Sequence, residues 1–120
     1  MQKEYRIKSK QDYAKVYRHG KSVANFQFVL YWLEVKRATH FRLGISASKK
    51  IGNAVVRNRM RRIVKEIVRL NADLLNVPVD IVIIIRKPAV DMNYNDLQKS
   101  IMHLYRKAGF VSSFQKKDKL

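Results

Sequence analysis

The segment KKIGNAVVRNRMRRIVKE, residues 49–66, joins a glycine-containing turn to a run with helical spacing, and it holds many basic residues and one acid. From about residue 56 to residue 75, apolar residues recur at the period of an α-helix. At about 100° per residue they share one side of that helix; they are Val56, Met60, Ile63, Val64, Ile67 and Val68. This stretch therefore predicts a helix with one buried side and one cationic side.

The cationic side of this helix carries no acid, since the nearest one, Glu66, falls outside the arc. Like charges four residues apart repel by roughly a few tenths of a kcal/mol per pair, a cost that a bound polyanion would remove. An ordinary solvated face is the alternative interpretation, but such faces usually mix both signs of charge. The pattern favours anion binding by Arg57, Asn58, Arg61, Arg62, Lys65 and Arg69.

The turn before the helix has the features of a phosphate-binding entry. Gly52 has access to backbone angles that are closed to other residues, and Asn53 is a candidate N-cap. The free N–H groups at a helix start add partial positive charge to that of Lys49 and Lys50. The spacing is not that of a Walker P-loop, and no G-x-G-x-x-G motif occurs.

Size and charge limit what the chain can be. It has 120 residues, a formal net charge of +17 and 47% hydrophobic residues. We expect a single domain over residues 1–111 and a flexible basic tail over 112–120. The charge predicts a polyanionic partner, because each basic residue placed on a phosphate releases counterions. With no apolar run near the roughly 20 residues of a membrane span and no signal peptide, we expect a cytoplasmic protein without a membrane partner.

Two further helices are predicted from capping residues. Ser9 and Asp12 resemble an N-terminal cap, and the short helix that follows would end before Gly20. Near the other end of the chain, Asn93 caps a helix with an apolar stripe that ends at Gly109.

Three strands are predicted from apolar patterns. Residues 26–35, with Phe26 on the apolar face, and residues 41–48 alternate, and we expect them to pair antiparallel through residues 36–40. The continuous apolar run at 79–86 suits a central position in the sheet.

The elements follow one another as α-β-β-α-β-α, with a short extra strand near residues 21–24. This order predicts an α/β (α+β) two-layer sandwich in which helices cover a small mixed sheet.

The sequence favours binding over catalysis. The chain has no cysteine, which excludes a disulfide framework and Cys-based zinc sites. His19, His40 and His103 are isolated, and the acids are scattered without a pair at catalytic spacing. We therefore expect no catalytic residue and no metal ligand in this chain.

A second surface is expected around the first helix. Tyr13 and Tyr17 point the same way, and the open face of the strand pair carries Val29, Tyr31 and Ser46. Core packing is the ordinary explanation for such a spacing. If the helix borders the uncovered face of the sheet, the tyrosines would instead line a groove in which unpaired bases stack.

The sequence KKIGNAVVRNRMRR resembles the signature of the protein component of bacterial ribonuclease P. The resemblance runs over nearly the whole chain, through DYAKVYRHGKSVAN, FVLYWLE, GISASKKIGNAVVRNRMRRIVKE, IVIIIRKPAV and IMHLYRKAGF. It implies a monomeric protein subunit that binds a catalytic RNA and the 5′ leader of precursor tRNA. It further implies that the RNA cleaves the leader with bound Mg²⁺, and that the protein alone binds no cofactor.

The resemblance also assigns residues to surfaces. It implies RNA binding by Lys49, Lys50, Gly52, Asn53, Arg57, Asn58, Arg59, Arg61, Arg62, Lys65 and Arg69. It implies a leader cleft formed by Tyr13, Tyr17, Val29, Tyr31 and Ser46, where many members have phenylalanine in place of both helix tyrosines. The family fold carries an unusual left-handed β-α-β crossover, although right-handed crossovers are the general rule.

Two other functions remain open on the sequence. The charge fits a ribosomal or other structural RNA-binding protein equally well. A helix-turn-helix DNA binder fits less well, because its recognition helix closely follows another helix, whereas here the basic helix precedes a long apolar strand.

Overall fold

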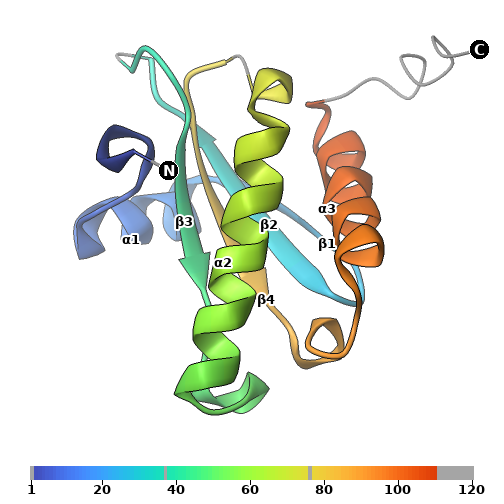
Figure 1. The fold of residues 1–120 in the computed structure, drawn as a ribbon. Coiled ribbons are helices and arrows are strands. Elements are labelled where there is room, and N and C mark those ends of the chain that lie inside the picture. The colour runs from blue at the N-terminus through green and yellow to red at the C-terminus, as the bar shows by residue number, and fades with distance from the viewer. Residues whose placement is uncertain (1, 37, 76, 111–120) are drawn as a thin grey trace, which may run out of the picture.

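The computed structural model describes residues 2–36, 38–75 and 77–110, so the tail expected at 112–120 lies outside the described residues. Three α-helices and four strands follow one another in the predicted order (Figure 1). The helices are α1 (Lys10–His19), α2 (Ala54–Leu70) and α3 (Tyr94–Ala108), and the strands are β1 (Lys21–Ala24), β2 (Phe28–Glu34), β3 (Arg42–Ser46) and β4 (Val79–Ile85). The extra strand expected near residues 21–24 is confirmed as β1.

The strands form one mixed sheet in the order β1-β2-β4-β3. Strand β4 pairs antiparallel with β2 and parallel with β3. The predicted antiparallel pairing of β2 with β3 is therefore wrong, because β4 lies between them. The physical reason is burial: almost every residue of β4 is buried, so it requires a neighbour on each side, whereas the alternating β3 suits an edge.

The connection from β3 through α2 to β4 is left-handed, as the family resemblance implies. In Figure 1, α2 lies in front of the sheet, both strands run downward, and β4 lies to the right of β3. A right-handed connection would place β4 on the left. Helix α3 covers the same face of the sheet as α2, and α1 lies behind it.

The main core fills the space between the sheet and the helices α2 and α3. Its largest fully buried side chains include Phe28, Leu30, Met60, Ile81 and Ile101. A smaller core on the opposite face is built from Ile7, Val16 and Val82. The two-layer arrangement thus holds for α2 and α3, while α1 covers only part of the second face.

Strand β2 begins two residues later than predicted, and this leaves Phe26 68% exposed. The side-chain oxygen of Asn25 accepts hydrogen bonds from the backbone N–H groups of Gln27 and Phe28, at 3.0 and 2.9 Å. This turn keeps Phe26 out of the strand and off the buried face. Its predicted place on that face is therefore wrong.

Each α-helix begins at a side-chain cap. The side-chain oxygens of Ser9, Asn53 and Asn93 accept hydrogen bonds from the backbone three residues later. Helix α2 ends at Leu70, several residues before the predicted end, because Asn71 leaves the helical backbone conformation. Within the described residues, no helix is long and apolar enough to cross a membrane.

Candidate nucleic-acid interface

Helix α1 lies along the side of β3 that faces away from α2. Successive outward positions of β3 contact α1: Arg42 meets Asp12, Gly44 meets Tyr13, and Ser46 meets Tyr17. Alternate residues of a strand face the same side of the sheet. Positions 42, 44 and 46 of β3 therefore present one side to α1, and their contacts set where the helix lies on the sheet.

An ion cluster fixes the first turn of α1 to the sheet. Arg42 Nε donates to Asp80 Oδ1 at 2.9 Å, and Arg42 Nη2 donates to Asp80 Oδ2 at 2.7 Å. Arg42 Nη1 also lies 3.3 Å from Asp12 Oδ2. Asp80 is 3% exposed, and its hydrogen bonds raise the pKa of Arg42 above its ordinary value. The guanidinium of Arg42 compensates the charge of the buried Asp80 carboxylate, and its contact with Asp12 holds α1 in place.

The ring of Tyr13 packs directly on β3. A β-carbon at Gly44 would lie 2.5 Å from Tyr13 Cε1, which is closer than real contacts allow. Glycine at this position therefore lets the tyrosine approach the sheet.

Tyr17 and Tyr31 form the aromatic wall of the exposed half of this face. Their ring centroids are 5.0 Å apart in an edge-to-face arrangement, and Tyr17 is 40% exposed. Burial raises the pKa of Tyr17, and the nearby Tyr13 and Tyr31 add to this, while a side-chain hydrogen bond with Ser46 opposes it. The phenol is therefore neutral at neutral pH, with an exposed ring available for stacking.

Sheet register places three further partly exposed residues on the same face as the tyrosines. Val29 of β2 and Ser46 of β3 both align with Ile84 of β4, and all three are partly exposed. The cleft residues predicted from the sequence thus come together on one face. Ile84 was missed, although its place on β4, two residues from the buried Val82, points to it. Below, this surface keeps the name leader cleft, after the expectation drawn from the sequence; it consists of Tyr13, Tyr17, Val29, Tyr31, Ser46 and Ile84.

The entry to α2 has the geometry expected of it. Gly52 adopts a φ of +153°, in a region that favours glycine. The side-chain oxygen of Asn53 accepts a hydrogen bond from the backbone N–H of Val56 at 3.0 Å. Lys49 and Lys50 are exposed in the short 3-10 turn just before Gly52.

The basic side of α2 faces the β3 edge and solvent. Arg57 Nη1 donates to the Gly52 carbonyl at 3.0 Å, which ties this side chain to the entry turn. Arg61 donates to Asn58 Oδ1 at 3.1 Å and to the Ala47 carbonyl at 3.4 Å, beside the end of β3. Arg62 is exposed. These contacts orient Arg57 and Arg61. Below, the cationic row means the basic residues on this side of α2: Arg57, Arg61, Arg62, Lys65 and Arg69.

A small cavity joins the basic helix to the α1 face. Arg61 and Lys65 line it from α2, and Tyr13 lines it from α1. Arg6, from the segment that bridges to Leu43, also lines it. No local pattern predicts the place of Arg6, because it depends on the pairing of the N-terminal segment with the edge of β3. The two predicted surfaces are therefore adjacent.

Arg59 and Arg69 differ from the other predicted RNA-binding residues in what they contact. Arg59 points toward the α3 side, where its Nη2 donates to the Val90 carbonyl at 3.4 Å. Arg69 forms a forked pair with Glu66, at 3.0 and 2.7 Å. The structure thus places Arg59 outside the arc of Arg57, Arg61 and Lys65, and it gives Arg69 an acidic neighbour.

The carboxylates nearest the cleft are engaged in structure. Asp12 and Asp80 both bind Arg42. Within residues 2–36, 38–75 and 77–110, no group of three or more His, Cys, Asp or Glu side chains is arranged to hold a metal ion.

Comparison with known proteins gives one consistent match. The family model described as Ribonuclease P matches residues 1–109. The ribonuclease P protein component of Staphylococcus carnosus is 49% identical over 108 residues, covering 90% of this chain and 93% of that protein. The corresponding protein of Bacillus velezensis is 44% identical over 117 residues, covering 98% and 100%.

Solved structures agree with the sequence comparison. The RNase P protein of Staphylococcus aureus aligns with a TM-score of 0.81 at 44% identity, covering 87% of this chain and 94% of that chain. The RNase P protein of Thermotoga maritima aligns with a TM-score of 0.78 at 28% identity, covering 85% and 96%. Both similarities extend over most of the described fold.

Proposed function

The chain belongs to the ribonuclease P protein family, and from this premise we propose that it binds the catalytic RNA through α2 and the 5′ leader of precursor tRNA through the leader cleft. Membership makes it a protein component that acts in tRNA processing with an RNA subunit. The proposal adds which surface of the chain meets which part of the RNA.

The row of cations on α2 supports the first contact. Arg57 and Arg61 are oriented by carbonyl groups of their own chain, so less side-chain freedom is lost when a phosphate binds. The helix start at Asn53 adds N–H groups that favour a phosphate near Lys49 and Lys50. Phosphate contacts of this kind position an RNA without reading its sequence.

The leader cleft supports the second contact. An unpaired strand needs exposed aromatic rings for its bases and cations for its phosphates. Tyr17 and Tyr31 supply the rings, and Lys65 lies on the cavity that borders Tyr13. A mature tRNA lacks the leader, so it would leave this cleft empty.

We further propose that hydrolysis takes place on the RNA subunit. The carboxylates beside the cleft, Asp12 and Asp80, are paired with Arg42 and are not placed to activate water. When bound by the RNA, Mg²⁺ would supply the activated water and stabilise the leaving oxygen. The protein contributes charge neutralisation and holds the substrate.

The adjacency of the cationic row and the leader cleft is the observation that carries this proposal, since both meet at the cavity lined by Tyr13, Arg61 and Lys65. The test is reconstitution with the catalytic RNA at a magnesium concentration too low for the RNA alone. Adding the protein should restore cleavage of precursor tRNA at the 5′ end of the mature sequence. No cleavage with intact, folded RNA would overturn the assignment.

A further inference from the structure

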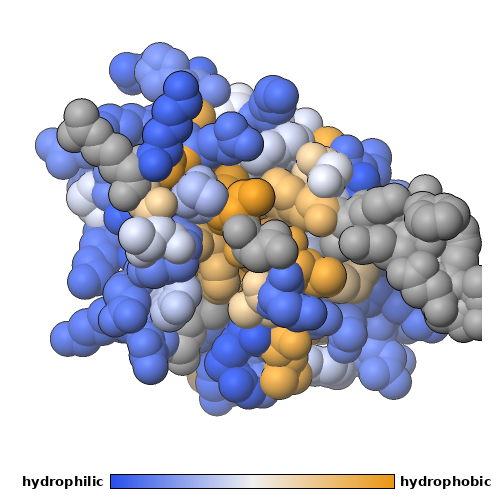
Figure 2. All heavy atoms as spheres, turned by 90° about the horizontal axis from the view of Figure 1, so that it is seen from above, coloured by the Kyte–Doolittle hydropathy of each residue, from blue (hydrophilic) through white to orange (hydrophobic). Residues whose placement is uncertain are grey.

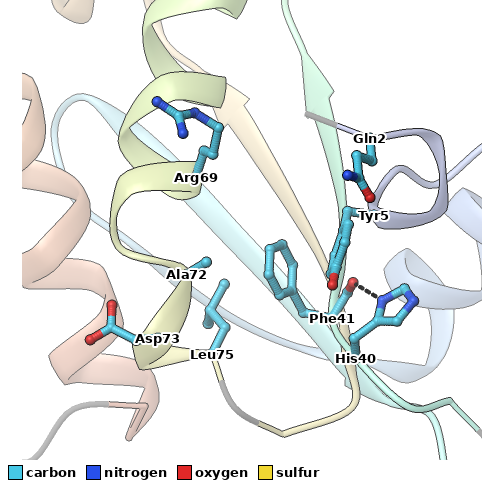
Figure 3. A pocket seen from close by; sticks show the side chains of 8 residues that line it. All are labelled: Gln2, Tyr5, His40, Phe41, Arg69, Ala72, Asp73 and Leu75. Carbon is cyan, nitrogen blue, oxygen red and sulfur yellow. Dashed lines mark hydrogen bonds between the residues drawn. The ribbon is translucent and has the colours of Figure 1, made fainter.

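A second cavity, of about 780 Å³, lies at the opposite end of α2 from the entry turn. It opens between the last turn of α2, the start of β3 and the N-terminal segment (Figure 3). Figure 2 views this end of the molecule and shows apolar surface surrounded by hydrophilic side chains. Its lining includes Gln2, Tyr5, His40, Phe41, Arg69 and Leu75. None of these except Arg69 belongs to the surfaces described above.

The cavity has an apolar floor and an aromatic wall. Phe41 and Leu75 form the floor and are 5% and 2% exposed. The ring of Tyr5 lies 4.2 Å from that of His40 and 5.2 Å from that of Phe41, measured between centroids. His40 Nδ1 donates to the Phe41 carbonyl at 2.8 Å, because a carbonyl only accepts. These contacts fix Tyr5 and His40 before any ligand arrives.

The opposite wall is the guanidinium of Arg69. In Figure 3 this side chain projects from α2 across the opening from Gln2 and Tyr5. Its forked hydrogen bonds to Glu66 leave the two side chains 51% and 46% exposed. A pair this exposed adds little to stability, but the fork fixes the plane of the guanidinium and leaves its faces open. A fixed guanidinium plane is a platform on which a base stacks.

The cationic row leads to this cavity. Arg61, Lys65 and Arg69 follow one another at intervals of four residues, which corresponds to about 6 Å along a helix. Arg61 and Lys65 line the small cavity beside Tyr13, and Arg69 lines the large one. A single RNA strand whose phosphates follow this row would bring its next base to the opening between Arg69 and Tyr5.

We propose that this cavity binds an unpaired nucleobase, stacked between Tyr5 and Arg69, from an RNA strand that runs along α2. Gln2 at the rim supplies both a hydrogen-bond donor and an acceptor for the edge of the base. The base site adds one contact to the proposed function and rests on it, because α2 must bind the RNA first. The base comes either from the catalytic RNA or from the precursor.

The experiment compares the variants Tyr5→Leu and Arg69→Lys with the wild-type protein. Arg69→Lys keeps the charge and removes the planar fork, so it separates stacking from simple attraction. Lys99→Arg, which exchanges the same two cations at an exposed position on α3, is the matched control. The affinity of the protein for the catalytic RNA is measured first. The affinity of the reconstituted holoenzyme is then measured for precursor tRNA with and without a leader.

Each test variant should lower one of these affinities by about fivefold or more, the lower range for losing one base stack. A loss with the catalytic RNA alone places the base in that RNA, and a loss only with leader-bearing precursor places it in the leader. Lys99→Arg should stay within about twofold of wild type in every arm. If Arg69→Lys does so as well, the base site is refuted. Wild-type protein that fails to bind the catalytic RNA would instead refute the proposed function. Because Arg69 is exposed, its variant tests the site even if Tyr5→Leu unfolds the N-terminal segment.

Discussion

The ring of Tyr13 occupies the space that a side chain at Gly44 would need, since a β-carbon there would lie 2.5 Å from Cε1 and 2.7 Å from the hydroxyl oxygen. The glycine is required by this contact and not by its backbone, because its φ lies outside the left-handed region. One position on β3 thereby sets how closely α1 approaches the sheet, and with it the shape of the leader cleft.

Gly44→Ala should move Tyr13 and weaken leader binding. We expect the affinity of the holoenzyme for leader-bearing precursor to fall by about fivefold or more, the size of one lost base stack. Overpacking should also lower the free energy of unfolding by about 1–3 kcal/mol. Equilibrium binding and denaturant unfolding measure the two effects.

The matched control is the double-mutant cycle with Tyr13→Ala. If the effect of position 44 passes through the ring, the double variant should bind the leader no more weakly than Tyr13→Ala alone. Additive losses would mean that Gly44 acts on the cleft by another route.

Removing Arg42 should destabilise the fold more than removing Asp12. Arg42→Leu leaves the Asp80 carboxylate buried without its partner, and such a loss costs about 3–5 kcal/mol for a deeply buried pair. The partly exposed Asp12→Asn should cost about 1 kcal/mol or less. Urea unfolding measures both, and equal costs would show that Asp80 does not depend on Arg42.

Arg61→Ala should change the salt dependence of RNA binding. Loss of one phosphate contact lowers the slope of log affinity against log salt by about one. Lys99→Ala on α3 removes the same charge from another surface and should leave the slope unchanged. A slope that is the same for Arg61→Ala and wild type would remove Arg61 from the phosphate-binding row.

Gly52→Ala should disturb the entry to α2. Position 52 has a φ of +153°, and a β-carbon there would lie 2.9 Å from Val56. We expect a loss of roughly 1–3 kcal/mol in unfolding free energy, as for other residues forced into rare backbone conformations. Gly109→Ala is the control, because its φ is +87° but nothing lies within 4 Å of a β-carbon there. If both variants lose equally, the contact with Val56 adds nothing to the backbone strain.

Local signals predicted the elements well because each rests on neighbouring residues. Asn53 and Gly52 mark the start of α2, and the apolar run of β4 predicted its central place. The pairing of β2 with β3 was predicted wrongly, because sequence alternation does not reveal which strand is inserted between two others. The predicted place of Phe26 is wrong because the side chain of Asn25 stabilises a turn there, which alternation of apolar residues does not reveal.

Contacts within one element could be predicted from local geometry, whereas specific contacts between elements could not. Tyr13 and Tyr17 lie one turn apart on α1, so their common direction follows from helix geometry. Arg42 and Asp80 are 38 residues apart, and only the parallel register brings them together. The cavity between Tyr5 and Arg69 likewise depends on how the N-terminal segment and the end of α2 fold toward each other.

Leader binding is tested most directly by the affinity of the holoenzyme for precursor tRNA relative to mature tRNA, measured with wild-type protein and with Tyr17→Ala. Tyr17 is 40% exposed, so its loss removes ring surface from the cleft with little effect on the core. Wild type should prefer the leader-bearing precursor, and Tyr17→Ala should reduce that preference by about fivefold or more with unchanged affinity for mature tRNA. If Tyr17→Ala lowers the affinity for both RNAs equally, or leaves the preference for the precursor unchanged, the leader does not bind in the leader cleft.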